Sequence, residues 1–419
     1  SKEEFMRKLK RISTILLAIT MLSGCSQSSN IQVEKQEVQT DVVNLTVWGG
    51  SNEQELLAEM VESFKNEYAD EATFEITIEP EEEGTCKERI LADVGAAPDV
   101  FTFADDQLME LAAAGVIEPI EAEAQIRENN VEGAVEAATI NERIYAYPMT
   151  ADNGYFMFYN KKYLSQQDVA TLDKILSVAG SLNKKVTMDW TSGWYLYSFF
   201  GNTGLKMGLN PDGLTNYCDW NSKSAEIKGV DIGNAMLAIA KNPGFMSGGD
   251  EQLIAGAKDG SVIAGISGIW VSNALQQAWG DDFAAVKLPT YTVAGKEVQL
   301  ASYAGYKLIG VNAYSEEKEW AMKLAQWLTN EENQTLRFIK RGLGPSNKIA
   351  GATKEVKQSP AIQALIEQST YASLQRVGAK YWDPVSTFGK SLVEGRASAN
   401  NMQQLMDTMV KEITMKVTD

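Results

Sequence analysis

The side chains that could do chemistry in this sequence are carboxylates, because the chain of 419 residues contains no histidine. The absence of histidine excludes Ser-His-Asp and Cys-His nucleophile systems and zinc sites of the H-E-x-x-H type. Carboxylate-only chemistry stays open, and a glycosidase would need two acids roughly 5 to 10 Å apart. The chain has 56 Asp and Glu residues, and no pair of them stands out. We therefore predict no catalytic residue, no metal site and no cofactor.

The balance of charge restricts the partners further. Asp and Glu outnumber Lys and Arg by 56 to 38, so the formal net charge is −18. A general nucleic-acid-binding protein is excluded, because such proteins present a basic patch. An anionic ligand would need a local basic pocket.

The first 25 residues have the organisation of a secretory signal. Basic residues lie between positions 7 and 11, an apolar run extends from Ile12 to Met21, and a lipobox of sequence Leu-Ser-Gly-Cys ends at Cys25. The apolar run has about ten residues, against roughly 20 for a membrane-spanning helix. We predict that residues 1–24 are removed as a signal peptide and that lipidated Cys25 anchors the protein in the membrane. The alternative is a short buried helix that ends at an ordinary cysteine.

We predict that residues 26–41 form a flexible tether, because this stretch lacks hydrophobic periodicity. The elements that must position a binding site follow the tether. Beyond the tether, short apolar runs alternate with stripes at helical spacing, which predicts parallel strands joined by crossover helices. Gly115 would end one helix, and residues 329–332 match a capping box that opens another. Strands are expected near 45–48, 74–78, 98–101, 155–159 and 262–266, and helices near 56–64, 90–94, 107–114, 172–179, 320–328, 382–394 and 402–417.

Several short motifs occur in a fixed order along residues 44–417. They are Leu45 to Gly49, Ala97 to Val100, Ala146 to Pro148 followed by Phe158 to Lys161, Ser267 to Trp270, Leu288 to Thr290, and Trp327 to Glu331. In this order and spacing the sequence resembles the extracytoplasmic solute-binding proteins of ABC importers, and most closely the maltose/maltodextrin-binding group. Each motif alone is weak, and their combination carries the resemblance.

The resemblance implies an α/β fold of the type II periplasmic-binding-protein kind, with two lobes joined by a hinge. Each lobe would be a mostly parallel sheet flanked by helices, and hinge closure would trap a ligand in the cleft. Cys86 and Cys218 would then lie in different lobes and stay unpaired. The expected boundaries are 42–150 plus 303–350 for lobe 1, 155–298 plus 356–419 for lobe 2, and 150–154, 299–304 and 350–356 for the hinge.

The resemblance also implies a sugar ligand. A sugar has apolar C–H faces and hydroxyl edges, so its site needs aromatic rings that stack and polar groups that hydrogen-bond. Carried over from the family motifs, Trp270 and Trp382 match two stacking positions in the cleft, and Trp194 and Phe103 fall at two further aromatic positions. For each of these rings, packing in the hydrophobic core is the alternative.

The polar positions of the family site map onto acidic residues. Asp106 matches an aspartate in the cleft, and Asp152 or Asn153 falls at the hinge where the family has a glutamate. Solvated surface is the alternative for these acids. Two further sets of residues complete the predicted site: Asn52 and Glu53 at the start of the first helix, where the lysine expected beside the acid is missing, and Trp190 and Tyr155, for which core packing is equally expected.

The function implied by the resemblance is that of a monomeric lipoprotein on the extracellular face of the cytoplasmic membrane. It would capture maltooligosaccharides and deliver them to the permease of an ABC transporter, without catalysis. Successive aromatic rings favour an oligosaccharide of several units over a monosaccharide. Three alternatives stay open: another oligosaccharide as ligand, a sugar sensor or adhesin of the same fold, and a secreted glycosidase.

Overall fold

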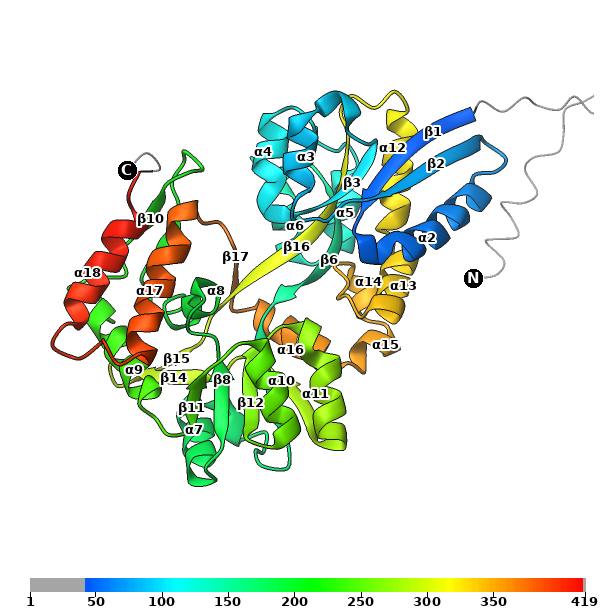
Figure 1. The fold of residues 1–419 in the computed structure, drawn as a ribbon. Coiled ribbons are helices and arrows are strands. Elements are labelled where there is room, and N and C mark those ends of the chain that lie inside the picture. Colours follow the sequence, from blue (N-terminus) through cyan, green and yellow to red (C-terminus); the bar gives the residue numbers. More distant parts are fainter. Residues whose placement is uncertain (1–41, 417–419) are drawn as a thin grey trace, which may run out of the picture. The chain divides into compact units, whose positions relative to one another are not determined.

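The computed structural model describes residues 42–416, and the predicted signal peptide, Cys25 and the tether lie outside this range. The described residues fall within one compact unit, and their secondary structure alternates between strands and helices (Figure 1). No helix within this range is both long and apolar enough to span a bilayer.

The first large sheet contains the N-terminal strands of the described range. Its strand order is β17-β16-β3-β1-β2, and β6 pairs with β16 outside this path. The first three strands of the chain are parallel, as the alternation of strand and helix predicts, whereas β16 runs antiparallel to both β3 and β6. The strands are β1 (Val42–Gly49), β2 (Thr73–Pro80), β3 (Val100–Ala104), β6 (Tyr147–Gly154), β16 (Ser302–Val311) and β17 (Ala372–Leu374).

The helices of the first lobe bury apolar stripes against this sheet. In α2, residues 56, 57, 60, 61 and 64 are buried, which is the spacing that places side chains on one helix face. The helix α4 is followed by Gly115 with a φ of 71°, as predicted for a residue that ends a helix. The helices are α2 (Gln54–Glu67), α3 (Cys86–Ala92), α4 (Leu108–Ala113), α5 (Glu123–Asn129), α6 (Glu132–Ala137), α12 (Lys318–Leu328), α13 (Glu331–Arg341), α14 (Lys348–Gly351) and α15 (Lys354–Lys357).

The capping box predicted for residues 329–332 is wrong in its register. The N-cap of α13 is Asn330, whose side chain accepts a hydrogen bond from the backbone N–H of Asn333. The hydroxyl of Thr329 instead donates to the carbonyl of Ala325 in the preceding helix. Asn and Thr both favour such positions, and the local sequence alone does not decide between them.

The second large sheet has the strand order β11-β8-β12-β7-β13 and mixes parallel with antiparallel pairs. Alternate residues of β7 face opposite sides of this sheet. Met157 and Tyr159 join the larger hydrophobic cluster, whereas Phe156 and Phe158 pack into a smaller one. The strands are β7 (Phe156–Asn160), β8 (Lys185–Met188), β11 (Phe245–Ser247), β12 (Val262–Ser267) and β13 (Phe283–Val286).

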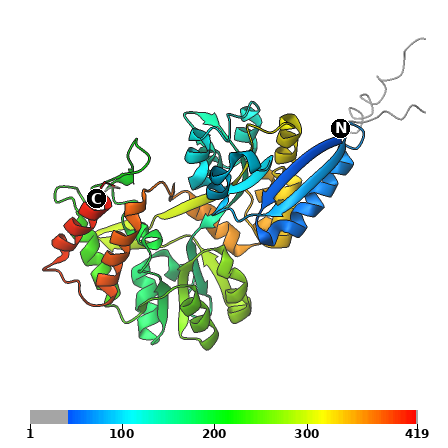
Figure 2. The same cartoon turned by 45° about the horizontal axis from the view of Figure 1, so that its top comes forward.

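Helices cover both faces of the second sheet, and the C-terminal helices α17 and α18 lie side by side (Figure 2). The helices of this lobe are α7 (Leu172–Ser181), α8 (Gly193–Leu196), α9 (Gly229–Ala240), α10 (Asp250–Asp259), α11 (Ser272–Trp279), α16 (Pro360–Ser369), α17 (Trp382–Val393) and α18 (Met402–Ile413). Three two-stranded ribbons complete the structure: β4 (Thr139–Ile140) with β5 (Arg143–Ile144), β9 (Met207–Leu209) with β10 (Asn216–Cys218), and β14 (Thr290–Val293) with β15 (Lys296–Gln299). Cys86 and Cys218 are free thiols, as predicted.

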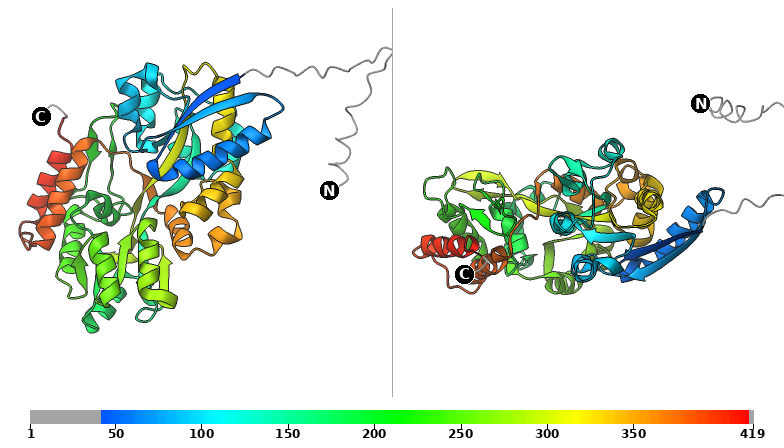
Figure 3. Two further views of the ribbon diagram at one scale, coloured as in Figure 1. Left: turned by 45° about the vertical axis from the view of Figure 1, so that its right-hand side comes forward. Right: turned by 90° about the horizontal axis from the view of Figure 1, so that it is seen from above.

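The chain passes between the two lobes several times. Tyr155 is the single residue between β6 of the first sheet and β7 of the second. The strand β16 lies beside β6, and both can be followed between the sheets (Figures 1 and 3). Further passages lead from α15 to α16, from α16 to β17, which pairs with β16, and from β17 to α17. Residues 372–374 therefore belong to the first sheet, within a stretch that we assigned to lobe 2 from the sequence.

Candidate functional site

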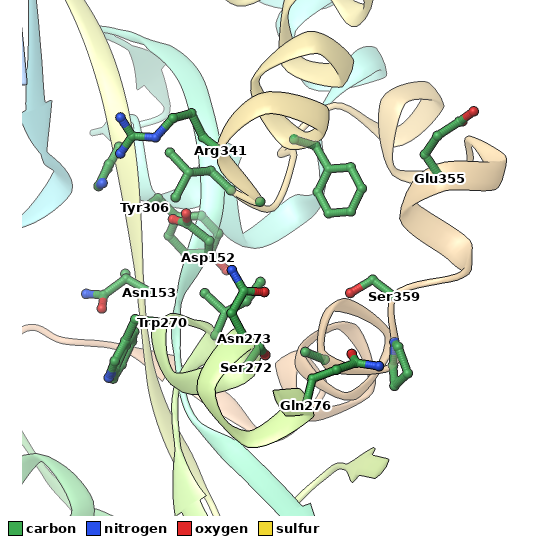
Figure 4. A pocket seen from close by; sticks show the side chains of 18 of the residues that line it. Asp152, Asn153, Trp270, Ser272, Asn273, Gln276, Tyr306, Arg341, Glu355 and Ser359 are labelled. Atoms are coloured by element: carbon green, nitrogen blue, oxygen red, sulfur yellow. The ribbon is translucent and has the colours of Figure 1, made fainter. Parts of the chain in front are cut away.

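A cavity of about 720 Å³ lies where residues of both sheets meet (Figure 4). This volume is within the range of roughly 300 to 1,000 Å³ that is usual for small-molecule sites. One side is formed by polar residues that follow β3, together with residues of β6 and β16. The other side is formed by residues that follow β12. The residues used below are Asp105, Asp106, Asp152, Asn153, Trp270, Ser272, Asn273, Gln276, Lys307, Arg341, Glu355 and Gln358.

Trp270 presents the largest aromatic surface to this cavity. It lies in a 3-10 helical turn after β12, and its side chain is 49% exposed although the ring is apolar. The indole Nε1–H donates to the Asp250 carboxylate over 2.7 Å, and the hydroxyl of Ser267 donates to the other oxygen of Asp250 over 2.5 Å. Asp250 therefore fixes the orientation of the ring from the N-terminus of α10. The sequence analysis missed Asp250, since nothing in its local sequence points to Trp270.

The residue beneath the Trp270 ring, Gly268, is a glycine for a steric reason. A Cβ atom built on Gly268 would lie 2.0 Å from the Trp270 ring, far inside van der Waals contact. Any side chain at this position would displace the ring, so Gly268 allows the indole to lie close to the backbone.

Trp194 adjoins Trp270, and Tyr155 adjoins Trp194. The ring centroids of Trp194 and Trp270 are 5.9 Å apart, with an angle of 31° between their planes. The ring of Tyr155 packs against Trp194, and its hydroxyl donates to the backbone carbonyl of Trp194 over 2.7 Å. Because Tyr155 is completely buried, it supports Trp194 rather than facing the cavity. The structure thus brings together three residues that the sequence analysis selected separately.

Two neighbouring acids after β3 have different surroundings. Asp105 is buried, and its carboxylate accepts a hydrogen bond from the backbone N–H of Tyr306 and one from Arg376 at 2.7 Å. Asp106 faces the cavity from an exposed position. The pKa of Asp106 is raised, first because nearby atoms displace water from its carboxyl group and second because Asp105 repels its charge. Asp106 is the predicted site residue, and its carboxylate has oxygens free to accept hydroxyls.

Asp152 lies on β6 and lines the cavity near Lys307 of β16, whose ammonium group forms an ion pair with Glu83 at 3.7 Å. Burial raises the pKa of Asp152, against the opposing effects of the Lys307 charge and of the Thr150 hydroxyl, which donates over 2.8 Å. Burial alone would lower the pKa of Lys307, but the charges of Asp152, Glu83 and Glu53 raise it. Lys307 therefore stays protonated, and it supplies a lysine to the cavity from a strand where the sequence analysis did not look for one.

A second cavity of about 750 Å³ adjoins the same strands, and Asn153 borders both. None of the described residues that line this second cavity is a Trp or an Asp. The first cavity combines an exposed indole with carboxylates and a lysine, so we take it as the candidate site.

Comparison with known proteins agrees with this fold. Residues 59–364 match the family described as bacterial extracellular solute-binding protein. The chain is a member of this family.

Similar proteins span most of the chain. A galactooligosaccharide-binding protein of Bacillus subtilis (strain 168) is 22% identical over 98% of this chain and 99% of its own length. A maltotriose-binding protein of Pyrococcus abyssi is 26% identical over 81% of this chain and 74% of its own. A maltodextrin-binding protein from L. casei, solved without ligand, has a TM-score of 0.78 at 24% identity and covers 90% of this chain and 100% of its own. The solute-binding protein thus has the predicted two-lobe α/β fold.

Some residues predicted for the site of this solute-binding protein lie elsewhere in the structure. Phe103 is completely buried because it lies on β3, between β16 and β1, and packs against Phe101. Trp190 is also completely buried, against Phe199 and Phe245. The structure offers neither ring to the cavity, since apolar neighbours cover both.

Three of the remaining predicted residues do not line the cavity either. Glu53 is 3% exposed and forms an ion pair with the buried guanidinium of Arg337 at 3.3 Å. Asn52 is exposed in the turn before α2. Trp382 is partly buried at the start of α17, with its ring 4.9 Å from that of Tyr381. Asn153 does line the cavity, from an exposed position on β6.

Proposed function

We propose that this protein captures an oligosaccharide in the cavity beside Trp270 and delivers it to the permease of an ABC transporter. The observation that supports this most is the half-exposed indole of Trp270, held by Asp250 next to the carboxylates of Asp106 and Asp152. An indole face offers a large rigid contact for the C–H face of a pyranose. A carboxylate accepts hydroxyl hydrogens in charge-assisted bonds, which are stronger than neutral ones. This combination suits a neutral sugar.

Maltooligosaccharides are the first candidates, and galactooligosaccharides are the second because a relative over nearly the whole chain carries that name. We expect isothermal titration calorimetry to detect binding of maltotriose and maltotetraose, with no binding of lactose or phosphorylated sugars. A galactooligosaccharide series measured in parallel decides between the two candidates. If no member of either series binds, the proposed function is wrong. Release of shorter sugars from maltotetraose would instead favour a glycosidase, and a gene neighbourhood without a permease would favour a sensor or adhesin.

We propose further that ligand binding closes a hinge at residues 150–154, 299–304 and 350–356, between lobes with the boundaries given above. The first two of these segments include the paired ends of β6 and β16, where Ala304 lies opposite Gly154. Small-angle X-ray scattering should show a smaller radius of gyration at saturating sugar. An unchanged radius would indicate a rigid site.

We also propose that lipidated Cys25 holds the protein at the extracellular face of the membrane, as a monomer. Mass spectrometry of the mature N-terminus should find a lipid-modified Cys25. An unmodified chain that retains Met6 would contradict the proposed anchor.

The two carboxylates of the cavity predict how affinity depends on pH. The pKa of Asp106 and that of Asp152 are both raised, so each takes up its proton at a higher pH than an ordinary Asp, whose pKa is near 3.9. A protonated carboxyl loses an acceptor, so affinity falls as pH drops through the raised pKa. Without histidine, no side chain has an ordinary pKa near 6.5. We expect nearly constant affinity between pH 6 and 8 and a decline below about pH 5.

Calorimetric titration with one oligosaccharide at four pH values tests this dependence. A change of tenfold or more between pH 6 and 8 would contradict it. Such a change would mean that a carboxylate titrates far above its ordinary range or that the ligand itself ionises.

A further inference from the structure

The cavity extends beyond Trp270 into a region bordered by α11, the C-terminus of α13 and the segment from α15 to α16, where most lining side chains are polar and Phe338 of α13 adds an aromatic ring. We propose that this polar end of the cavity is an additional subsite, which binds a further neutral sugar unit mainly through hydrogen bonds. The polar end is defined by Ser272, Asn273, Gln276, Arg341, Glu355 and Gln358. The proposal rests on the proposed function and specifies which part of a long ligand the protein contacts here.

One side of the polar end is formed by the start of α11. Asn273 and Gln276 are three residues apart, so they lie on the same face of the helix, and both border the cavity (Figure 4). Neither amide forms a hydrogen bond with any described residue, and both side chains are exposed. Each amide offers donors and acceptors at once, which matches the hydroxyl groups of a sugar. The free capacity of these amides is therefore directed at the cavity.

Ser272 gives independent evidence on the same side. Its hydroxyl oxygen is buried and has no hydrogen-bond partner among the described residues, and it lines the cavity with Asn273. Buried hydroxyls are nearly always satisfied, so an unsatisfied one calls for an explanation. A ligand hydroxyl in the polar end would supply the missing partner.

Arg341 lies on the opposite side, at the last residue of α13. Its guanidinium forms no ion pair with any described acid, although the chain carries an excess of acids. Arg337 and Arg376 differ in this respect, because Arg337 pairs with Glu53 and Arg376 with Asp105. A guanidinium has five N–H donors in a fixed plane. Arg341 is thus available to donate to ligand oxygens.

The charge of the polar end favours a neutral unit over an anionic one. Glu355 and Asp152 line the same cavity as Arg341 and Lys307, so the two negative charges offset the two positive ones. An added carboxylate would therefore meet no excess of positive charge, and the two acids would repel it. A hydroxyl-bearing pyranose can instead accept from Arg341 and the amides and donate to Glu355 and Gln358.

The test compares ligands of increasing length. Calorimetry would measure the affinities of maltose, maltotriose, maltotetraose and maltohexaose, and of galactooligosaccharides of two to six units. The variants are Arg341→Gln and the double substitution Asn273→Ala with Gln276→Ala. The control is Gln277→Ala, since Gln277 is a neighbour on the same helix that does not line the cavity. Thermal unfolding would confirm that each variant is folded. Because the two sets of substitutions lie on different helices, one variant still tests the proposal if the other does not fold.

We expect the ratio of hexasaccharide to disaccharide affinity to fall about three- to tenfold in the double variant, the effect of losing one or two neutral hydrogen bonds. Arg341→Gln should lower the same ratio about tenfold, because bonds from a charged group are stronger. Gln277→Ala should leave it unchanged. If the wild-type protein binds a series but the ratio is unchanged in both variants, the subsite is wrong and the proposed function stands. If the wild-type protein binds neither series, both fail.

Discussion

Replacement of Trp270 by alanine is expected to lower oligosaccharide affinity by about 2 to 3 kcal/mol, or roughly 30- to 150-fold. When a pyranose stacks on the half-exposed ring, water leaves both the ring and the face of the sugar. Alanine removes this contact. Because the ring is exposed and turned to the cavity, its loss should cost little folding stability. Calorimetry with the best-binding oligosaccharide measures the effect.

A matched control is Tyr314→Ala. Tyr314 is 67% exposed and lies outside the lining of the candidate cavity, so its loss should leave affinity unchanged. Wild-type affinity in Trp270→Ala would show that the ring does not bind the sugar.

The role of Asp250 can be separated from that of the ring itself. Asp250→Ala keeps the indole but removes the acceptor for its Nε1–H, so we expect an intermediate loss of affinity. Asp250→Asn retains a carbonyl acceptor and should restore much of it. Near-ultraviolet circular dichroism reports on the geometry of Trp270 and Trp194, whose centroids are 5.9 Å apart. An unchanged spectrum and affinity in Asp250→Ala would contradict the positioning role.

Replacement of Arg337 by methionine is expected to lower the free energy of unfolding by about 3 to 5 kcal/mol. The side chains of Arg337 and Glu53 are 1% and 4% exposed, and one carboxylate oxygen of Glu53 already lacks a hydrogen-bond partner. Removal of the guanidinium would leave the carboxylate buried without an opposite charge. Urea unfolding of the purified protein measures the change.

The pair of Arg337 and Glu53 can be tested further with a double-mutant cycle and with a control ion pair between the same two helices. Glu53→Met combined with Arg337→Met should destabilise less than Arg337→Met alone, because no charge is then left buried. Lys340 and Glu59 form an exposed ion pair that also joins α13 to α2, and Lys340→Met should cost at most about 1 kcal/mol. Equal losses in Lys340→Met and Arg337→Met would contradict this account.

Glu53 shows the limit of transferring a site residue from a motif alone. The sequence places an acid at the start of the first helix, where the family has one, but Arg337 is 284 positions further along the chain. Whether this acid faces solvent, ligand or a buried guanidinium depends on how α13 packs against α2. We therefore expect Glu53 variants to change stability while leaving the affinity of the folded protein intact.

Local patterns in the sequence were sufficient to predict some of the elements, such as α2 and β1, but they did not predict β6, β8 or β16. Buried positions 56, 57, 60, 61 and 64 recur at the helical period, and residues 43, 45 and 47 recur at the period of a strand. The predicted helix end at Gly115 is confirmed by its positive φ. These features depend on contacts within a few residues, which is why they can be inferred without knowledge of the fold. The ordered motifs then indicated the two-lobe architecture.

Only the tertiary structure decided which of the chemically similar side chains face the cavity. Phe103, Trp190 and Trp270 are all aromatic and all follow or belong to strands, yet only Trp270 is exposed. Its exposure depends on Gly268 beneath the ring and on Asp250 at its edge, and Asp250 comes from a separate helix. Lys307 enters the site because β16 pairs with β6 across a long separation in sequence. The exposure of a side chain and the pairing of two strands depend on how distant segments pack together. A local pattern of residue types therefore cannot predict them.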